Sequence, residues 1–142
     1  MKRMITTASV SLVLAGSLAA CSGAAASGGA ATAEEAANTF FSSLASGDGA
    51  KFCGILASPK GEVLTDSEVQ KCKDSGEFKT LESQGTSLFK DIKINGVTMS
   101  GDSDAKFDST KVTPTSSATL VDALSKNLSL KKIDGKWYVV LG

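Results

Sequence analysis

Hydrophobic residues recur every three or four positions after residue 33, which is the spacing of one face of an α-helix. The residues on this face are Ala36, Ala37, Phe40, Phe41 and Leu44. Thr32 precedes the pattern as a candidate N-cap with Glu35 three positions later, and Gly47-Asp48-Gly49 follows it. The pattern therefore predicts an amphipathic helix that begins near residue 33 and ends before residue 47.

Two shorter helical patterns follow. The first carries Phe52, Cys53, Ile55 and Leu56. In the second, Thr65 and Glu68 have the spacing of a capping box, which predicts a helix that carries Cys72. Phe78 and Leu81 are spaced for one more helical turn, within a stretch whose structure the pattern leaves ambiguous.

The period of the pattern changes beyond residue 85. Ile92 and Ile94 alternate with polar residues in a stretch rich in β-branched side chains, which predicts a strand within residues 89–99, bulged at Gly96. The next stretch has a weaker pattern. We expect a further strand within residues 105–112 and a loop or a short helix within residues 114–125.

The strongest β pattern closes the chain. Residues 128–133 and 136–141 both alternate, and Asp134-Gly135 lies between them. Asp-Gly predicts a hairpin because both turn residues must accept a positive φ. Helices first and strands last indicate an α+β fold, with N-terminal helices packed on one face of a curved antiparallel sheet.

The N-terminus has a different pattern. Lys2 and Arg3 precede an apolar stretch that is too short and too rich in Ser and Thr for a membrane span, which indicates a signal peptide. Its end, Leu18-Ala19-Ala20-Cys21, resembles the lipobox of bacterial lipoproteins. The resemblance implies cleavage between Ala20 and Cys21 and a diacylglycerol thioether on Cys21, with further acylation, for instance by palmitate. The alternative is an ordinary secretory peptide with an incidental cysteine.

This resemblance implies a protein anchored by lipid on the outer face of the cell membrane, because two acyl chains suffice for stable anchoring. Residues 1–20 would form the signal peptide. Residues 21–33, the lipidated cysteine and a run of Ser, Gly, Ala and Thr, would form a flexible linker. Residues 34–142 are enough for a single domain.

The charge of the chain limits the classes of partner that we expect. The 15 basic and 15 acidic side chains balance, and removal of Lys2 and Arg3 with the leader leaves a slight acidic excess. The basic residues do not cluster, so we expect no nucleic acid partner. The expected partners are the membrane, through the lipid, and a protein of the cell envelope.

The chain has three cysteines and no histidine. If Cys21 carries lipid, Cys53 and Cys72 remain as a pair in an oxidising compartment, which predicts a disulfide between the second and third helices. Two isolated cysteines without histidine match no zinc pattern. We therefore expect neither a metal site nor a cofactor other than the covalent lipid.

A second resemblance covers residues 34–142. It is carried by Phe40-Phe41 in the first helix, a cysteine in the next, and the closing Leu128-Ser129-Leu130 with Asp134-Gly135-Lys136-Trp137-Tyr138-Val139. These features are similar to small actinobacterial lipoproteins of the nuclear-transport-factor-2-like, or cystatin-like, superfamily. The resemblance implies a cone-shaped sheet. It implies no activity, because that superfamily includes isomerases, dehydratases, accessory domains of cell-wall enzymes and binding modules.

Candidate catalytic residues are few. The resemblance implies an Asp, His or Tyr in the mouth of the cone. The only tyrosine, Tyr138, is expected instead to form an amphipathic face or a hydrogen bond at the sheet edge. We therefore predict a non-enzymatic protein, with isomerase or hydrolase chemistry in a pocket as the less favoured alternative.

Two functions remain. The favoured one is a membrane-tethered protein-binding or accessory module of the envelope. The alternative is a carrier that binds a lipid or a small hydrophobic molecule in the cone of the sheet. The candidate lining of that pocket is Ile92, Ile94, Leu130, Trp137 and Val139. The same five side chains would equally serve as plain hydrophobic core.

Overall fold

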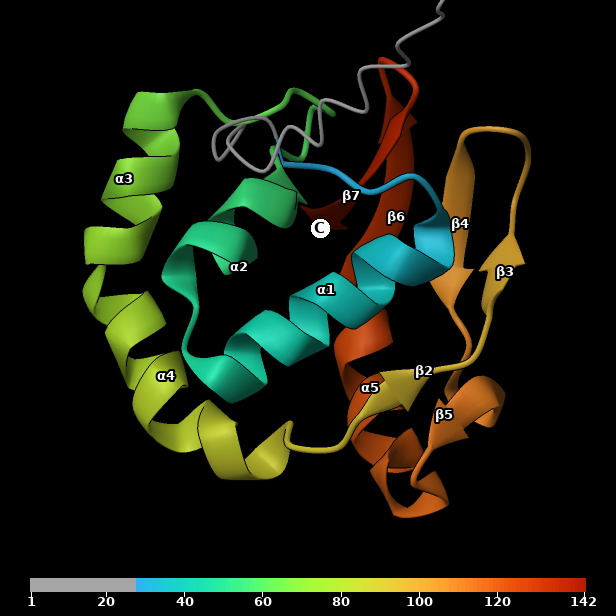
Figure 1. Cartoon of the computed structure of the whole chain (residues 1–142). Helices are drawn as coiled ribbons and strands as arrows, with labels where there is room; N and C mark the ends of the chain where they lie inside the picture. Colours follow the sequence, from blue (N-terminus) through green and yellow to red (C-terminus); the bar gives the residue numbers. More distant parts are fainter. Residues whose placement is uncertain (1–27) are drawn as a thin grey trace, which may run out of the picture.

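Figure 1 shows a computed structural model of the chain, which describes residues 28–142. The predicted signal peptide, its cleavage site at Ala20 and Cys21, and the lipidation of Cys21 lie outside the described residues. Within residues 28–142, no helix is both long enough and apolar enough to cross a membrane.

The described residues form five α-helices and two short 3₁₀ helices. The α-helices are α1 (Ala33–Ser46), α2 (Gly49–Ile55), α3 (Asp66–Asp74), α4 (Gly76–Leu88) and α5 (Ala118–Ser125). The 3₁₀ helices are η1 (Ser109–Lys111) and η2 (Thr115–Ser117). Four of the five α-helices precede most of the strands, as the sequence predicts.

Seven strands form two sheets. They are β1 (Leu56–Ala57), β2 (Lys93–Ile94), β3 (Val97–Met99), β4 (Asp104–Phe107), β5 (Val112–Thr113), β6 (Leu128–Ile133) and β7 (Lys136–Leu141). The larger sheet has the order β1-β7-β6-β4-β3, and β2 pairs with β5 in a sheet of two strands. All pairs are antiparallel except β1 with β7, which is parallel.

The helices cover one face of the larger sheet. In Figure 1, α1 lies across the sheet, and it contacts β6 and β7 as well as the small strand β2. Helices α2 and α4 pack against α1, and α3 packs against α2 and α4. The α+β fold with helices packed on a curved sheet is thus confirmed.

The predicted helix ends are confirmed. The Thr32 hydroxyl accepts a hydrogen bond from the Glu35 amide at 3.1 Å, and Gly47 ends α1 in the left-handed region at φ 68°. Thr65 and Glu68 form a complete capping box at the start of α3. Helix α4 is longer than the single turn that the hydrophobic spacing around Phe78 indicates.

The stretch predicted as one strand within residues 89–99 is two strands in different sheets. Strand β2 pairs with β5, and β3 pairs with β4, so the chain changes partner at Asn95 and Gly96. The strand expected within residues 105–112 is divided in the same way between β4, η1 and β5. Of the two structures expected for residues 114–125, the short helix is observed, as α5.

The predicted hairpin of β6 and β7 is confirmed. Asp134 and Gly135 have φ values of 49° and 81°, so both turn residues take the positive φ that such a turn requires. Trp137 and Val139 face the helices and are buried in the core. Tyr138 lies on the opposite face of β7, where its ring packs in a small second cluster.

The first described residues are held against the edge of β7. The backbone groups of Ala30 and Trp137 exchange two hydrogen bonds of 2.9 and 2.8 Å, and the Tyr138 hydroxyl donates to Gly28 O at 2.9 Å. A Cβ atom at Gly28 would lie 1.5 Å from Gly54 O, so glycine is required for this approach. The folded part therefore includes residues 28–33, which the sequence assigns to the linker.

Candidate functional site

The predicted disulfide is present. The Sγ atoms of Cys53 and Cys72 are 2.02 Å apart, and their Cα atoms are 6.0 Å apart. The bond joins α2 to α3, as expected. Cys53 is fully buried, whereas Cys72 is partly exposed and lies at the wall of the hollow described next.

An apolar hollow of about 300 Å³ lies between the helices and the end of the sheet where β6 begins and β7 ends. Its size is at the lower end of the range for small-molecule sites, roughly 300–1,000 Å³. We call it the phenylalanine–leucine hollow. Its lining residues are Phe40, Leu44, Phe52, Leu56, Cys72, Ser75, Glu77, Phe78, Leu81, Phe89, Leu124, Leu128 and Leu141.

Aromatic rings form the inner wall of this hollow. The centroids of Phe40 and Phe52 are 5.3 Å apart, and those of Phe52 and Phe78 are 5.2 Å apart. All three side chains are at least 94% buried, since their exposed fractions are 5%, 6% and 5%. These rings are held by contacts with one another, so the inner wall is preformed.

Leucines form part of the rim. Leu81 from α4 is 43% exposed and Leu141 from β7 is 42% exposed, although both side chains are large and apolar. They are 60 residues apart in the chain, and both line this hollow. Exposed apolar groups gathered at the mouth of a concave site are typical of binding sites rather than of ordinary surface.

The hollow contains few polar groups. The Ser75 hydroxyl donates to Cys72 O at 2.7 Å and accepts from the Phe78 amide at 3.1 Å, so both of these interactions serve the junction of α3 and α4. Glu77 is the only charged lining residue, and it is exposed. The lining thus offers extensive apolar contact, and it offers no pair of groups for acid–base chemistry.

A second hollow, of about 430 Å³, lies between α1, α2 and the first described residues. Its lining residues are Gly28, Gly29, Ala30, Glu35, Thr39, Asp48, Ala50, Lys51, Gly54 and Ile55. We call it the N-terminal hollow. It is more polar than the phenylalanine–leucine hollow, because it includes three charged side chains.

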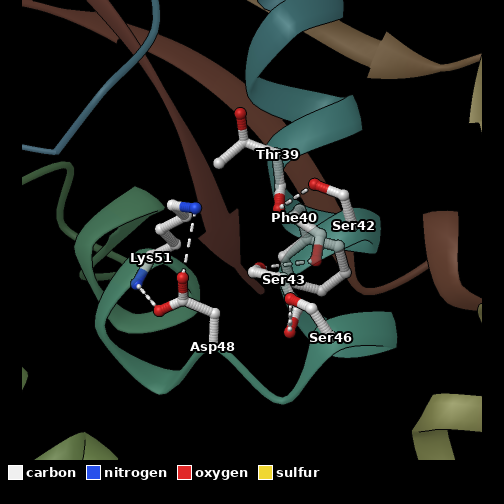
Figure 2. A network of polar contacts seen from close by, with 7 residues as sticks. All are labelled: Thr39, Phe40, Ser42, Ser43, Ser46, Asp48 and Lys51. Atoms are coloured by element: carbon white, nitrogen blue, oxygen red, sulfur yellow. Dashed lines mark hydrogen bonds and ion pairs between the residues drawn. The ribbon is translucent and has the colours of Figure 1, made fainter.

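Figure 2 shows three lining residues of the N-terminal hollow, Thr39, Asp48 and Lys51, together with the serines of α1. The Asp48 carboxylate accepts from the Lys51 amide at 3.1 Å and lies 3.2 Å from Lys51 Nζ. The hydrogen bond from the Lys51 amide is the main cause that lowers the pKa of Asp48. Along α1, the Ser42 and Ser43 hydroxyls donate to carbonyls one turn earlier. These contacts cap α2 and satisfy the serines of α1, so they have a structural role.

The five residues predicted to line a pocket in the cone are packed in the core. Ile94, Leu130 and Val139 are fully buried, and Ile92 and Trp137 are 8% and 5% exposed. None of the five lines either hollow. The apolar hollow lies beside this part of the core, at the helices, and its lining shares no residue with the predicted set.

Tyr138 forms a hydrogen bond, as expected, but it lies in β7, between β1 and β6, and not at the expected sheet edge. Its hydroxyl donates to Gly28 O, and burial is the main cause that raises its pKa, with a smaller contribution from the negative charge of Asp134. A hydroxyl with a raised pKa that holds a backbone carbonyl is suited to a structural role. Among residues 28–142, no three acidic or cysteine side chains gather in a way that could hold a metal ion.

Sequence patterns predicted some of the helices that line the phenylalanine–leucine hollow, but not the hollow itself. Phe78 and Leu81 have helical spacing, and Leu124 lies in the segment for which a helix was one of two expectations. Nothing in the local pattern shows that these residues face the end of β7. The hollow was therefore missed, because it depends on contacts between elements that are distant in the chain.

Fold and site together define a small α+β domain with one disulfide and an apolar hollow. The chain belongs to the DUF4878 family, a domain of unknown function, whose family model matches residues 25–140. No curated protein and no solved structure matches the chain.

Proposed function

We propose that this protein is a non-enzymatic binding module of the cell envelope, anchored to the outer face of the membrane by a lipid on Cys21. Its phenylalanine–leucine hollow binds a lipid or a small hydrophobic molecule. The lipobox-like sequence and the disulfide both support an extracytoplasmic location. We also propose that the domain is related to the nuclear-transport-factor-2-like superfamily.

The observation that carries the proposal is the hollow itself. Its concave shape, its phenylalanine wall and its half-exposed leucines favour a small apolar ligand over a flat protein interface. An apolar ligand would remove the exposed parts of Leu81 and Leu141 from water, which stabilises a complex by about 25 cal/mol per Å² of apolar surface. The lining shows no acid–base pair, which supports binding rather than catalysis.

The test is a titration with N-phenyl-1-naphthylamine, an uncharged hydrophobic probe whose fluorescence rises in apolar sites. The mature chain, residues 21–142 with Cys21→Ser, is suitable, because without the leader and the lipid it needs no detergent. We expect saturable binding of one probe per chain. Leu81→Glu should weaken this binding about tenfold or more, because it places a charge at the apolar rim.

Leu88→Glu is the matched control. Leu88 lies on the same helix, is 60% exposed, and does not line the hollow. It should leave the probe affinity unchanged. Equal affinities for the two variants, or the absence of saturable binding, would show that the hollow is not a ligand site. If Leu81→Glu instead abolished only the cross-linking of an envelope protein, the favoured function would be protein binding.

A further inference from the structure

We infer that the phenylalanine–leucine hollow selects its ligand by head-group charge. It accepts an amphiphile whose polar end is uncharged or cationic and discriminates against a carboxylate, and Glu77 is the specificity-determining residue. This inference rests on the proposed function, because it names the class of ligand for the same hollow.

The lining carries a single charge. Glu77 is exposed in the first turn of α4, and its neighbour Phe78 belongs to the inner wall. An apolar chain lying against Phe78 would place its polar end at the solvent-facing rim, where Glu77 lies. A carboxylate head would meet a like charge there, whereas a cationic head would meet an opposite charge.

None of the ion pairs among residues 28–142 involves Glu77. Lys73 belongs to α3, and its Nζ lies 3.4 Å from Gln70 Oε1. Lys126 follows α5, and its Nζ pairs with the Asp122 carboxylate at 3.9 Å. Neither lysine lines the hollow, and no other basic residue among the described residues does.

One amide at the start of α4 is already paired. The Ser75 hydroxyl already accepts the hydrogen bond of the Phe78 amide, so that amide is not available to a ligand carboxylate. The charge at the rim is therefore the feature that distinguishes one head group from another.

The experiment compares three ten-carbon ligands, decanol, decanoate and decyltrimethylammonium, at low ionic strength and pH 7 by isothermal titration calorimetry. The protein is the mature chain, residues 21–142, with Cys21→Ser. An exposed charge interaction changes an equilibrium constant by about two- to fivefold, and here it strengthens binding of the cation and weakens binding of the anion. We therefore expect the cation to bind about three- to tenfold more tightly than the anion.

Variants of Glu77 test whether its charge causes the preference for the cation. Glu77→Gln should bring the affinities for the cation and the anion together, and Glu77→Lys should reverse their order. Decanol should bind equally to all variants. Glu82→Gln is the matched control, because Glu82 lies on the same helix and does not line the hollow. It should keep the preference of the parent protein.

The outcomes separate this inference from the proposed function. If decanol binds and Glu77→Gln leaves the cation preference unchanged, or no preference exists, the charge selection is wrong and the hollow remains a ligand site. If decanol shows no saturable binding, both the selection and the proposed function are wrong.

Discussion

The side-chain amide of Asn38 forms two hydrogen bonds with the backbone of Ile94. Asn38 Nδ2 donates to Ile94 O at 2.8 Å, and Asn38 Oδ1 accepts from Ile94 N at 2.9 Å. Ile94 is fully buried and belongs to β2, whose only partner strand is β5. A side chain of α1 therefore takes the place of a neighbouring strand along the free edge of β2.

Asn38→Ala should destabilise the protein by about 2 kcal/mol, because it leaves a buried backbone donor and acceptor of Ile94 without partners. Urea unfolding followed by circular dichroism measures this change. Ser42→Ala is the control, since Ser42 is exposed on the same helix and bonds only within it, and its effect should stay within about 0.5 kcal/mol. Equal stability of the two variants would contradict the role given to Asn38.

Replacing Cys53 and Cys72 together by alanine should cost about 3 kcal/mol, because the bond closes a loop with a sequence separation of 19 residues. Urea unfolding in the Cys21→Ser background measures the loss. The double variant should also bind the hydrophobic probe more weakly, since Cys72 lines the hollow.

The protein as isolated, before any reduction, tests whether the disulfide forms. Alkylation without reduction, followed by mass spectrometry, should modify neither Cys53 nor Cys72. Two alkylated cysteines in the protein exported from the cell would contradict the bond.

The Asp108 carboxylate should titrate far below its ordinary range. Its pKa is lowered to about 2, mainly by hydrogen bonds from the Thr110 hydroxyl and amide, with further contributions from Thr98 and Lys111. Because the folded-state pKa is the lower one, the carboxylate stabilises the fold above pH 4, and this contribution is lost as the pH falls towards 2.

Two variants test Asp108. Asp108→Asn should be less stable than the parent protein at pH 7, and the difference should shrink as the pH falls from 4 to 2. Thr110→Val should raise the pKa of Asp108, which NMR titration of the carboxyl carbon measures. A parent pKa near 4 would refute this network of hydrogen bonds.

Cys21→Ala should release the protein from the membrane or leave it uncleaved, because the thiol that would carry the diacylglycerol is lost. Detergent phase partitioning of cell fractions measures the change. Incorporation of labelled palmitate into the parent protein and not into the variant is the matching control. Absence of the label from the parent protein, or equal label in the two proteins, would refute the lipid anchor.

Local patterns predicted the parts of this fold that local interactions determine. The hairpin from Leu128 to Leu141 follows from alternation and an Asp-Gly turn, and the start of α3 follows from Thr65 and Glu68. The break between β2 and β3 was not predicted, because β2 is held by Asn38, which is 56 residues away in the chain. The parallel pairing of β1 with β7 was not predicted either. The two strands are distant in the chain, and the two residues of β1 are too few to show alternation.

The candidate site also has one part that the sequence predicts and one part that it does not. The disulfide follows from the number of cysteines once Cys21 is set aside for lipid. The phenylalanine–leucine hollow depends on how α4, α5 and the end of β7 approach one another, which no single stretch of sequence encodes. The sequence predicted which apolar residues are buried. Which of the apolar residues line a hollow depends on how the helices and strands pack together.

The pairing of Ala30 with Trp137 has a mechanical consequence. A pulling force on the chain before Gly28 would reach the last strand of the domain before it reached α1. The two backbone hydrogen bonds and the Tyr138 hydroxyl would resist together, and β7 would pass the load to β6 along the whole hairpin. A domain loaded in this way takes the force first on its longest hairpin, before the helix α1.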